Sequence, residues 1–154
     1  MFPGMNGSPP WILTAGILIA FPVLFVGIWS FVCLLLATMS GWSGLAARFK
    51  APPGLRGTPM PSGWASRVGF VSYRGTLSFE ATPEGLIARV MRLFPFHPPL
   101  LLPRRALTLT RGGGFFTAGT LTVEGGTTFS LNEEAFQSVE RALGGAAATP
   151  FPRA

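Results

Sequence analysis

The first 47 residues contain no charged side chain, and residues 11–39 are apolar almost without interruption. Folded as a helix, this apolar run would be about 43 Å long at 1.5 Å per residue. The hydrocarbon core of a bilayer is ~30 Å thick, so a helix of this length crosses it with residues to spare. We therefore predict one transmembrane helix at residues 11–40, preceded by a short extracytoplasmic tail at residues 1–10.

A cleaved signal peptide does not fit the same region. Such a peptide needs a basic start, an apolar stretch of roughly 7–15 residues and small residues at the cleavage site. Residues 1–10 contain no Lys or Arg, the apolar run is longer, and no Ala-x-Ala pattern follows Met39. We expect the segment to be retained as an anchor.

The distribution of charge predicts the orientation of this anchor. Between residues 48 and 74 the chain has five basic residues and no acidic one, and no charge precedes the apolar run. Lys and Arg close to a span mark its cytoplasmic side. We expect the N-terminus outside and residues 48–154 in the cytoplasm.

Small residues in the apolar run indicate a surface for helix packing. Gly16 and Ala20 are four residues apart, a spacing that allows a second helix to approach closely. Pro22 leaves one carbonyl without its helical donor and is expected to kink the helix. Gly and Pro are also frequent in membrane helices generally, so the alternative is that these residues mark no specific packing surface. The run has no Asp, Glu, His, Lys or Arg, which argues against a proton path, an ion path or a metal ligand there.

The residues after the apolar run predict an interfacial helix. In segment 41–50, three apolar side chains recur at i, i+3 and i+7, and the basic residues lie off this stripe. This pattern is typical of a short amphipathic helix in the headgroup layer, with a frayed end of the span as the alternative. Aromatic residues at both ends of the run favour the interface as well. The predicted membrane-interface residues are Trp11, Trp42, Arg48, Phe49 and Lys50.

A linker and a β-rich domain are predicted next. Segment 51–63 has four prolines and three glycines, so we expect neither helix nor strand there. Residues 64–144 alternate apolar and polar side chains in several short runs, typical of strands. Pro and Gly in 82–85 predict a turn, and Gly125-Gly126 predicts a tight hairpin.

The domain is expected to end in one helix. Asn132 is a good N-cap, Phe136 and Val139 start an apolar stripe that continues to Leu143, and Gly144 suits a C-terminal cap. Six or seven strands followed by one helix is the order of a pleckstrin-homology-like antiparallel roll. An open antiparallel sheet with one packed helix is the alternative within the same small α+β class. Residues 145–154 are expected to form an extended tail.

The segment that begins at Thr82 contains the runs Pro-Glu-Gly-Leu and Phe-His-Pro-Pro-Leu-Leu-Leu-Pro. It resembles small membrane-anchored bacterial proteins of unassigned function, in which we expect Gly-His-Pro-Pro-Leu-Leu-Ile-Pro-Trp. Here Phe96 precedes His97, and Arg104-Arg105 stands where Trp and a polar residue would come. The resemblance covers about 25 residues and implies a structural module from a bacterium. Eleven arginines against one lysine fit a GC-rich bacterial genome. We therefore expect an inner (cytoplasmic or intracytoplasmic) membrane protein.

The sequence offers little support for catalysis. His97 is the only histidine and has no thiolate or carboxylate close by in sequence, so it is expected to be a turn residue bonded to backbone. The run Gly114–Thr120 has the glycine spacing of a phosphate loop but lacks its lysine. All six acidic residues are scattered Glu. We expect no enzyme activity, no cofactor, no metal and no small-molecule substrate.

Net charge +6 comes mostly from the stretch after the apolar run, where anionic lipid headgroups account for it. The remaining basic pair, Arg104 and Arg105, predicts contact with an acidic neighbour or a headgroup, with a solvated strand edge as the alternative. The charge is not clustered as a nucleic-acid face requires.

These features predict a non-catalytic accessory subunit of a larger bacterial membrane complex, by analogy of the photosynthetic reaction-centre–antenna or respiratory type. Its partners would be other integral membrane subunits and anionic lipid headgroups. The alternative is a free-standing membrane-anchored module that binds lipid or peptide.

Overall fold

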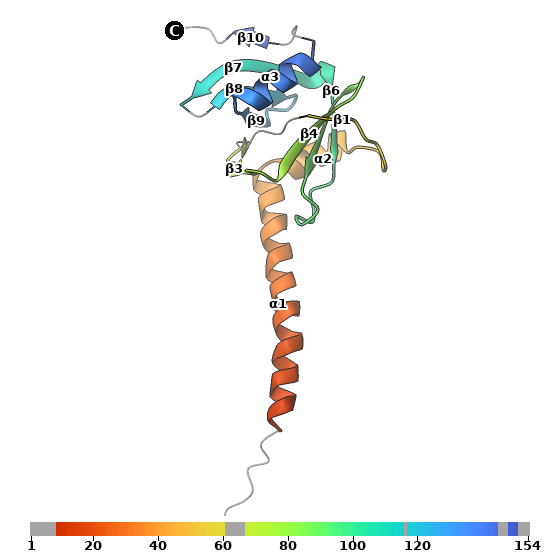
Figure 1. The fold of residues 1–154 in the computed structure, drawn as a ribbon, viewed down its shortest axis with the longest axis vertical. Helices are drawn as coiled ribbons and strands as arrows, with labels where there is room; N and C mark the ends of the chain where they lie inside the picture. Colours follow the sequence, from red (N-terminus) through yellow and green to blue (C-terminus); the bar gives the residue numbers. More distant parts are fainter. Residues whose placement is uncertain (1–8, 61–66, 116, 145–147, 151–154) are drawn as a thin grey trace, which may run out of the picture.

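The computed structural model describes residues 9–60, 67–115, 117–144 and 148–150. Figure 1 shows one long helix that extends away from a β-rich domain. Most of the predicted tail at residues 1–10 lies outside the described residues. The same holds for the junction of linker and domain at 61–66 and for 145–147 and 151–154 of the C-terminal tail.

The long helix, α1, comprises Pro10–Met39 and is long and apolar enough to cross a membrane. Pro10 suits the start of the helix. An amide in the first turn has no acceptor within the helix, so the N–H that proline lacks is not missed. Its end is set by Gly41, whose φ of 79° is left-handed. Cys33 and Ala37 are fully buried where the domain covers the last turns. A single long apolar helix next to a β-rich domain was predicted and is confirmed.

A short helix, α2, comprises Trp42–Phe49 and follows α1 after a two-residue turn. The expected helix is present, but its apolar stripe faces the domain core instead of the headgroup layer. Trp42 is fully buried and Leu45 is 3% exposed, while Phe49 is half-buried against the same core.

The first sheet has the order β1-β4-β5-β6, with every pair antiparallel. The turn predicted at 82–85 joins β4 to β5, with the Thr82 amide donating to the Gly85 carbonyl over 2.9 Å. The linker prediction is wrong at one place, because β1 pairs with β4 inside segment 51–63. The strands are β1 (Thr58–Pro59), β4 (Leu77–Ala81), β5 (Gly85–Val90) and β6 (Leu100–Pro103).

The second sheet has the order β10-β7-β8-β9-β2-β3 and is antiparallel except where β10 pairs with β7. The hairpin predicted at Gly125-Gly126 joins β8 to β9, and both glycines have positive φ. A 3₁₀ turn at Arg104–Ala106 leads into this sheet. Its strands are β2 (Arg67–Val68), β3 (Val71–Ser72), β7 (Leu107–Gly114), β8 (Thr117–Val123), β9 (Thr128–Leu131) and β10 (Ala148–Pro150).

The last helix, α3, comprises Glu133–Ala142 and covers the second sheet (Figure 1). Its predicted cap is confirmed, because Asn132 Oδ1 accepts the Ala135 amide over 2.9 Å. Phe136 and Val139 are fully buried on the sheet side. The two sheets share one core, in which the rings of Phe79 and Phe129 lie 5.8 Å apart.

Candidate functional site

The joint between α1 and the domain is built around one buried indole. Trp42 lies among three rings of the domain, with centroid distances of 6.1 Å to Tyr73, 5.7 Å to His97 and 6.3 Å to Phe129. Its Nε1 donates to the Pro98 carbonyl over 3.0 Å. Because Trp42 begins α2 immediately after the turn from α1, this packing fixes the direction of α1 against both sheets.

A chain of hydrogen bonds crosses the same joint. The Tyr73 hydroxyl lies 3.1 Å from the Ser40 hydroxyl and 2.8 Å from Nε2 of His97. On the other side of the ring, Nδ1 of His97 lies 3.0 Å from the Pro95 carbonyl, which can only accept. Nδ1 therefore carries a proton, and in the neutral ring Nε2 accepts the hydrogen bond that Tyr73 donates. The predicted backbone bond of His97 is confirmed; its bond to Tyr73 was not predicted.

Burial keeps the side chains of Tyr73 and His97 neutral near pH 7. Burial lowers the pKa of His97 below its ordinary value of 6.5, and the backbone bond to Pro95 opposes this only in part. Burial also raises the pKa of Tyr73 above its ordinary value of 10.0, against a smaller lowering by Ser40. The hydrogen bond between Tyr73 and His97 therefore joins two side chains that are both neutral near pH 7.

The β5–β6 loop, residues 91–99, reaches back along α1. Trp29 Nε1 donates to the Leu93 carbonyl over 3.0 Å, and the rings of Trp29 and Phe94 lie 5.6 Å apart. Trp29 is ten residues before the end of α1, so the loop extends about 15 Å along the helix from its end. Three apolar side chains of this loop are at least half exposed: Met91, Leu93 and Phe96.

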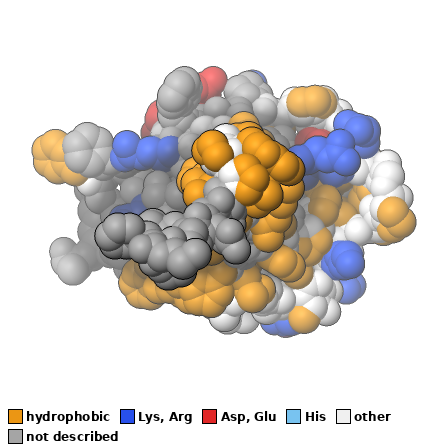
Figure 2. All heavy atoms as spheres, turned by 90° about the horizontal axis from the view of Figure 1, so that it is seen from below, with side chains coloured by type: hydrophobic (Ala, Val, Ile, Leu, Met, Phe, Trp, Pro, Cys, Tyr) orange, Lys and Arg blue, Asp and Glu red, His pale blue; other side chains and the backbone are white. Residues whose placement is uncertain are grey.

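A groove of about 820 Å³ lies between this loop and segment 50–56, and we call it the basic groove. Four of its lining residues are Lys or Arg, and none of the described lining residues is Asp or Glu. Figure 2, which looks along α1 towards the domain, shows apolar and basic side chains on several sides of the helix. The basic lining residues are Lys50, Arg56, Arg89 and Arg92.

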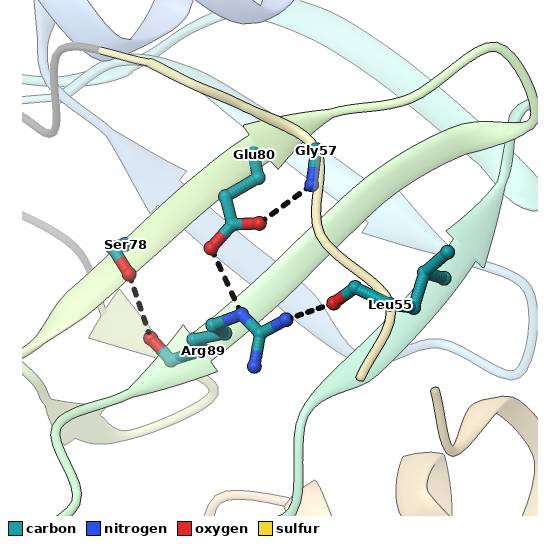
Figure 3. Close-up of polar contacts among 5 residues, drawn as sticks. All are labelled: Leu55, Gly57, Ser78, Glu80 and Arg89. Carbon is teal, nitrogen blue, oxygen red and sulfur yellow. Dashed lines mark hydrogen bonds and ion pairs between the residues drawn. The ribbon is translucent and has the colours of Figure 1, made fainter. Parts of the chain in front are cut away.

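One wall of the basic groove is held by a partly buried ion pair. Arg89 Nε donates to Glu80 Oε1 over 2.9 Å, and the Arg89 guanidinium also donates to the Leu55 carbonyl (Figure 3). Glu80 Oε2 accepts the Gly57 amide over 2.8 Å. The Glu80 side chain is only 14% exposed. The proline-rich segment is thus fixed against β4 and β5, and Glu80 neutralises Arg89.

Three charges of the basic groove have no such compensation. Within the described part of the chain, Lys50, Arg56 and Arg92 form no ion pair. All three are exposed to solvent. The His97 ring also lines the groove, but its lowered pKa leaves it uncharged near pH 7. The groove therefore presents a net charge of about three positive units to any ligand.

The predicted helix-packing residues lie far from this site. Gly16 and Ala20 are on the part of α1 that extends beyond the domain, and a side chain added at Gly16 would meet nothing within 4 Å. Pro22 is inside the helix, as expected. A packing role for these residues stays a prediction.

The predicted interface residues separate into two groups. The prediction that Trp42 lies at the membrane interface is wrong, because this residue is buried in the domain core and cannot lie among headgroups. Arg48 donates to the Glu124 carbonyl over 2.9 Å and so already has a partner within the domain. Lys50 lies on the basic groove, and Trp11 at the start of α1 is 68% exposed.

Arg104 and Arg105 lie at the far end of β6 from the loop that contacts α1. Pro103 pairs with Gly85 at that end, whereas Leu100 pairs with Ala88 at the other. Both arginines are exposed and without an ion pair among the described residues. The contact predicted for them, with an acidic neighbour or a headgroup, stays a prediction.

Sequence reasoning missed Trp29, Tyr73 and Arg92. Trp29 follows Trp11 by 18 residues, about 27 Å along a helix, and this match to the hydrocarbon thickness was a usable signal. Tyr73 is the only tyrosine of the chain. Nothing in the local sequence links it to His97, because their contact depends on the packing of both sheets.

The described residues contain no group of three or more His, Cys, Asp or Glu that could hold a metal ion. Comparison of the chain with protein-family models, curated proteins and solved structures finds no significant match. The resemblance of the segment after Thr82 to small bacterial membrane proteins therefore stays a prediction.

Proposed function

We propose that α1 spans a bacterial inner membrane and holds the β domain against its cytoplasmic surface. The length of α1, about 45 Å, exceeds the ~30 Å hydrocarbon core by roughly ten residues. Trp11 and Trp29 are separated by about 27 Å, so they suit the two interfaces. Cys33, about 6 Å past Trp29 along α1, would then lie at headgroup level, and Ala37, about 12 Å past it, would lie beyond the headgroups against the domain.

Orientation follows from the basic residues near this end of α1. The cytoplasmic side is expected to attract the five basic residues between 48 and 74, since none lies before α1. Protease added to right-side-out vesicles should spare the β domain, whereas its digestion there would reverse the proposed orientation.

Within the membrane, we propose the role of a non-catalytic accessory subunit of a larger complex. The observation that carries this proposal is the buried joint at Trp42, because it leaves no flexible tether between helix and domain. A chain of this kind positions one surface relative to another and can clamp neighbouring subunits. Photosynthetic reaction-centre–antenna and respiratory complexes are the proposed class of parent complex.

Gentle solubilisation of the native membrane, followed by native electrophoresis and mass spectrometry, tests this proposal. The chain should migrate with a large complex, and the co-migrating proteins would name it. Replacing Gly16 and Ala20 with Leu should weaken that association, because the added bulk separates helices. Leu in place of Ile17 and Val23, exposed residues that are already large, is the matched control. Migration of the native chain alone would refute the accessory role.

A free-standing lipid- or peptide-binding module is the second candidate. The basic groove favours this candidate. We propose a pleckstrin-homology-like roll for the domain from the two sheets of short strands that α3 follows. The described residues form ten strands instead of the predicted six or seven, and β10 comes after α3. Solitary migration in the native gel is the outcome that would favour this candidate.

A further inference from the structure

The basic groove lies at a particular depth relative to α1. Its loop contacts Trp29, the residue that we assign to the cytoplasmic interface, and its other wall begins at Lys50. This assignment rests on the proposed membrane span of α1. The hydrocarbon core would then end at about Trp29, and the groove would begin in the headgroup layer, which is roughly 5–8 Å thick on each side of the bilayer.

The side chains of the loop match this depth. Leu93 is 63% exposed and Met91 is 52% exposed. Apolar surface costs free energy in water, and this cost disappears at the boundary of the acyl chains. Between them in sequence lies Arg92, which faces the groove. An apolar–basic–apolar order suits a loop whose apolar side chains dip towards the lipid while its guanidinium stays among phosphates.

We propose that the basic groove binds the phosphate of an anionic phospholipid through Lys50, Arg56 and Arg92. Guanidinium groups bind phosphate in bidentate geometry, and an ammonium adds a compact charge. The fixed wall at Glu80 and Arg89 keeps the groove open, since the proline-rich segment cannot collapse into it. The acyl chains of the lipid would run beside the exposed Leu93 and Phe96.

The test uses the full chain in nanodiscs of phosphatidylcholine with about one-fifth phosphatidylglycerol, which imitates an anionic leaflet. Native mass spectrometry after detergent exchange measures the phosphatidylglycerol retained per chain. The double variant Lys50→Gln, Arg92→Gln should retain this lipid about thirty-fold more weakly. The variant Arg104→Gln, Arg105→Gln removes the same charge at the far end of β6 and should retain it as the wild type does.

Several results would overturn the proposal. Equal losses in the two double variants would mean nonspecific attraction, and no loss in either would mean that the groove binds no lipid. Arg56→Gln, with a roughly five-fold expected loss, replaces the double variant if that protein fails to fold. The lipid-free chain in neutral detergent is also tested with inorganic phosphate and with a hexaglutamate peptide. Binding of either probe without retention of phosphatidylglycerol would identify the ligand as a soluble anion or an acidic protein segment.

Alkaline carbonate extraction separates this proposal from the membrane span itself. A chain that resists extraction but retains no anionic lipid refutes only the groove. A chain released by carbonate refutes the span on which the groove depends.

Discussion

The Tyr73 hydroxyl and Nε2 of His97 lie 2.8 Å apart, although 24 residues separate them in the chain. Tyr73 follows β3 of the second sheet, and His97 belongs to the loop between β5 and β6 of the first. Since Ser40 continues the same chain of hydrogen bonds, the end of α1 and both sheets meet at these two rings. The first prediction concerns the charge state of this meeting point.

Folding stability should decrease as the pH falls below about 6.5. The lowered pKa of His97 means that the unfolded chain binds a proton more readily than the folded one. The contribution of the neutral ring is therefore fully present above 6.5 and is lost as the pH falls towards the folded pKa. Thermal unfolding of the detergent-solubilised chain between about pH 5 and pH 8 measures this.

The variant His97→Gln isolates the effect, because Gln does not titrate. Wild type and variant should differ in the slope of stability against pH, and Tyr73 does not contribute because its pKa is raised above 10.0. Parallel pH profiles would show that protonation of His97 does not change the stability of the joint.

Removing one donor should loosen the β5–β6 loop. Trp29→Phe keeps an aromatic ring beside Phe94 but removes the bond to the Leu93 carbonyl. A lost hydrogen bond of this kind costs about 1 kcal/mol, so amide exchange in residues 91–97 should accelerate roughly five-fold. Trp11→Phe at the exposed start of α1 is the control. Unchanged exchange in both variants would mean that packing alone holds the loop.

Breaking the Glu80–Arg89 pair should release the proline-rich segment. Glu80→Gln removes the charge that orients Arg89 and weakens the acceptor for the Gly57 amide, at a cost of about 1–3 kcal/mol. Limited proteolysis should then cut near Arg56 more rapidly. Glu133→Gln changes a 3.4 Å pair whose two side chains are about half exposed, so its stability should move by under about 1 kcal/mol. Equal protease sensitivity of the two variants would contradict this role of Glu80.

A methyl group at Gly119 should displace α3. A Cβ there would lie 2.6 Å from the Thr110 carbonyl oxygen and against the Phe136 ring. Overpacking of this kind costs roughly 1–3 kcal/mol, so Gly119→Ala should lower the unfolding temperature. Gly44→Ala in α2 meets nothing within 4 Å and should stabilise by about 0.5–1 kcal/mol. A gain in both variants would show that α3 moves aside without cost.

Patterns that act over a few residues were predictable from the sequence. The apolar run of α1, the turn at 82–85, the Gly125-Gly126 hairpin and the Asn132 cap depend on local geometry, and each forms where expected. These features fix the class of the fold. They do not fix which strands share a sheet.

The site depended on contacts that local patterns do not encode. The stripe headed by Trp42 was recognised as apolar, but a hydrophobic stripe does not say whether lipid or protein will cover it. The segment that contains β1 was expected to be irregular because prolines favour linkers, and it is held to β4 by Glu80, 23 residues later. The basic groove could be recognised only after two predictions were corrected. Trp42 packs into the domain core, and segment 51–63 contains β1.

The covered side of α1 restricts where another helix can lie. Trp29, Cys33 and Ala37 recur every four residues and share the side that meets the domain. At 100° per residue, Gly16 and Ala20 lie roughly 120° around the helix from them. Leu34 and Thr38, which lie on the same sector nearer the domain, are exposed as well. A neighbouring helix at Gly16 and Ala20 would therefore not compete with the domain for the same side of α1.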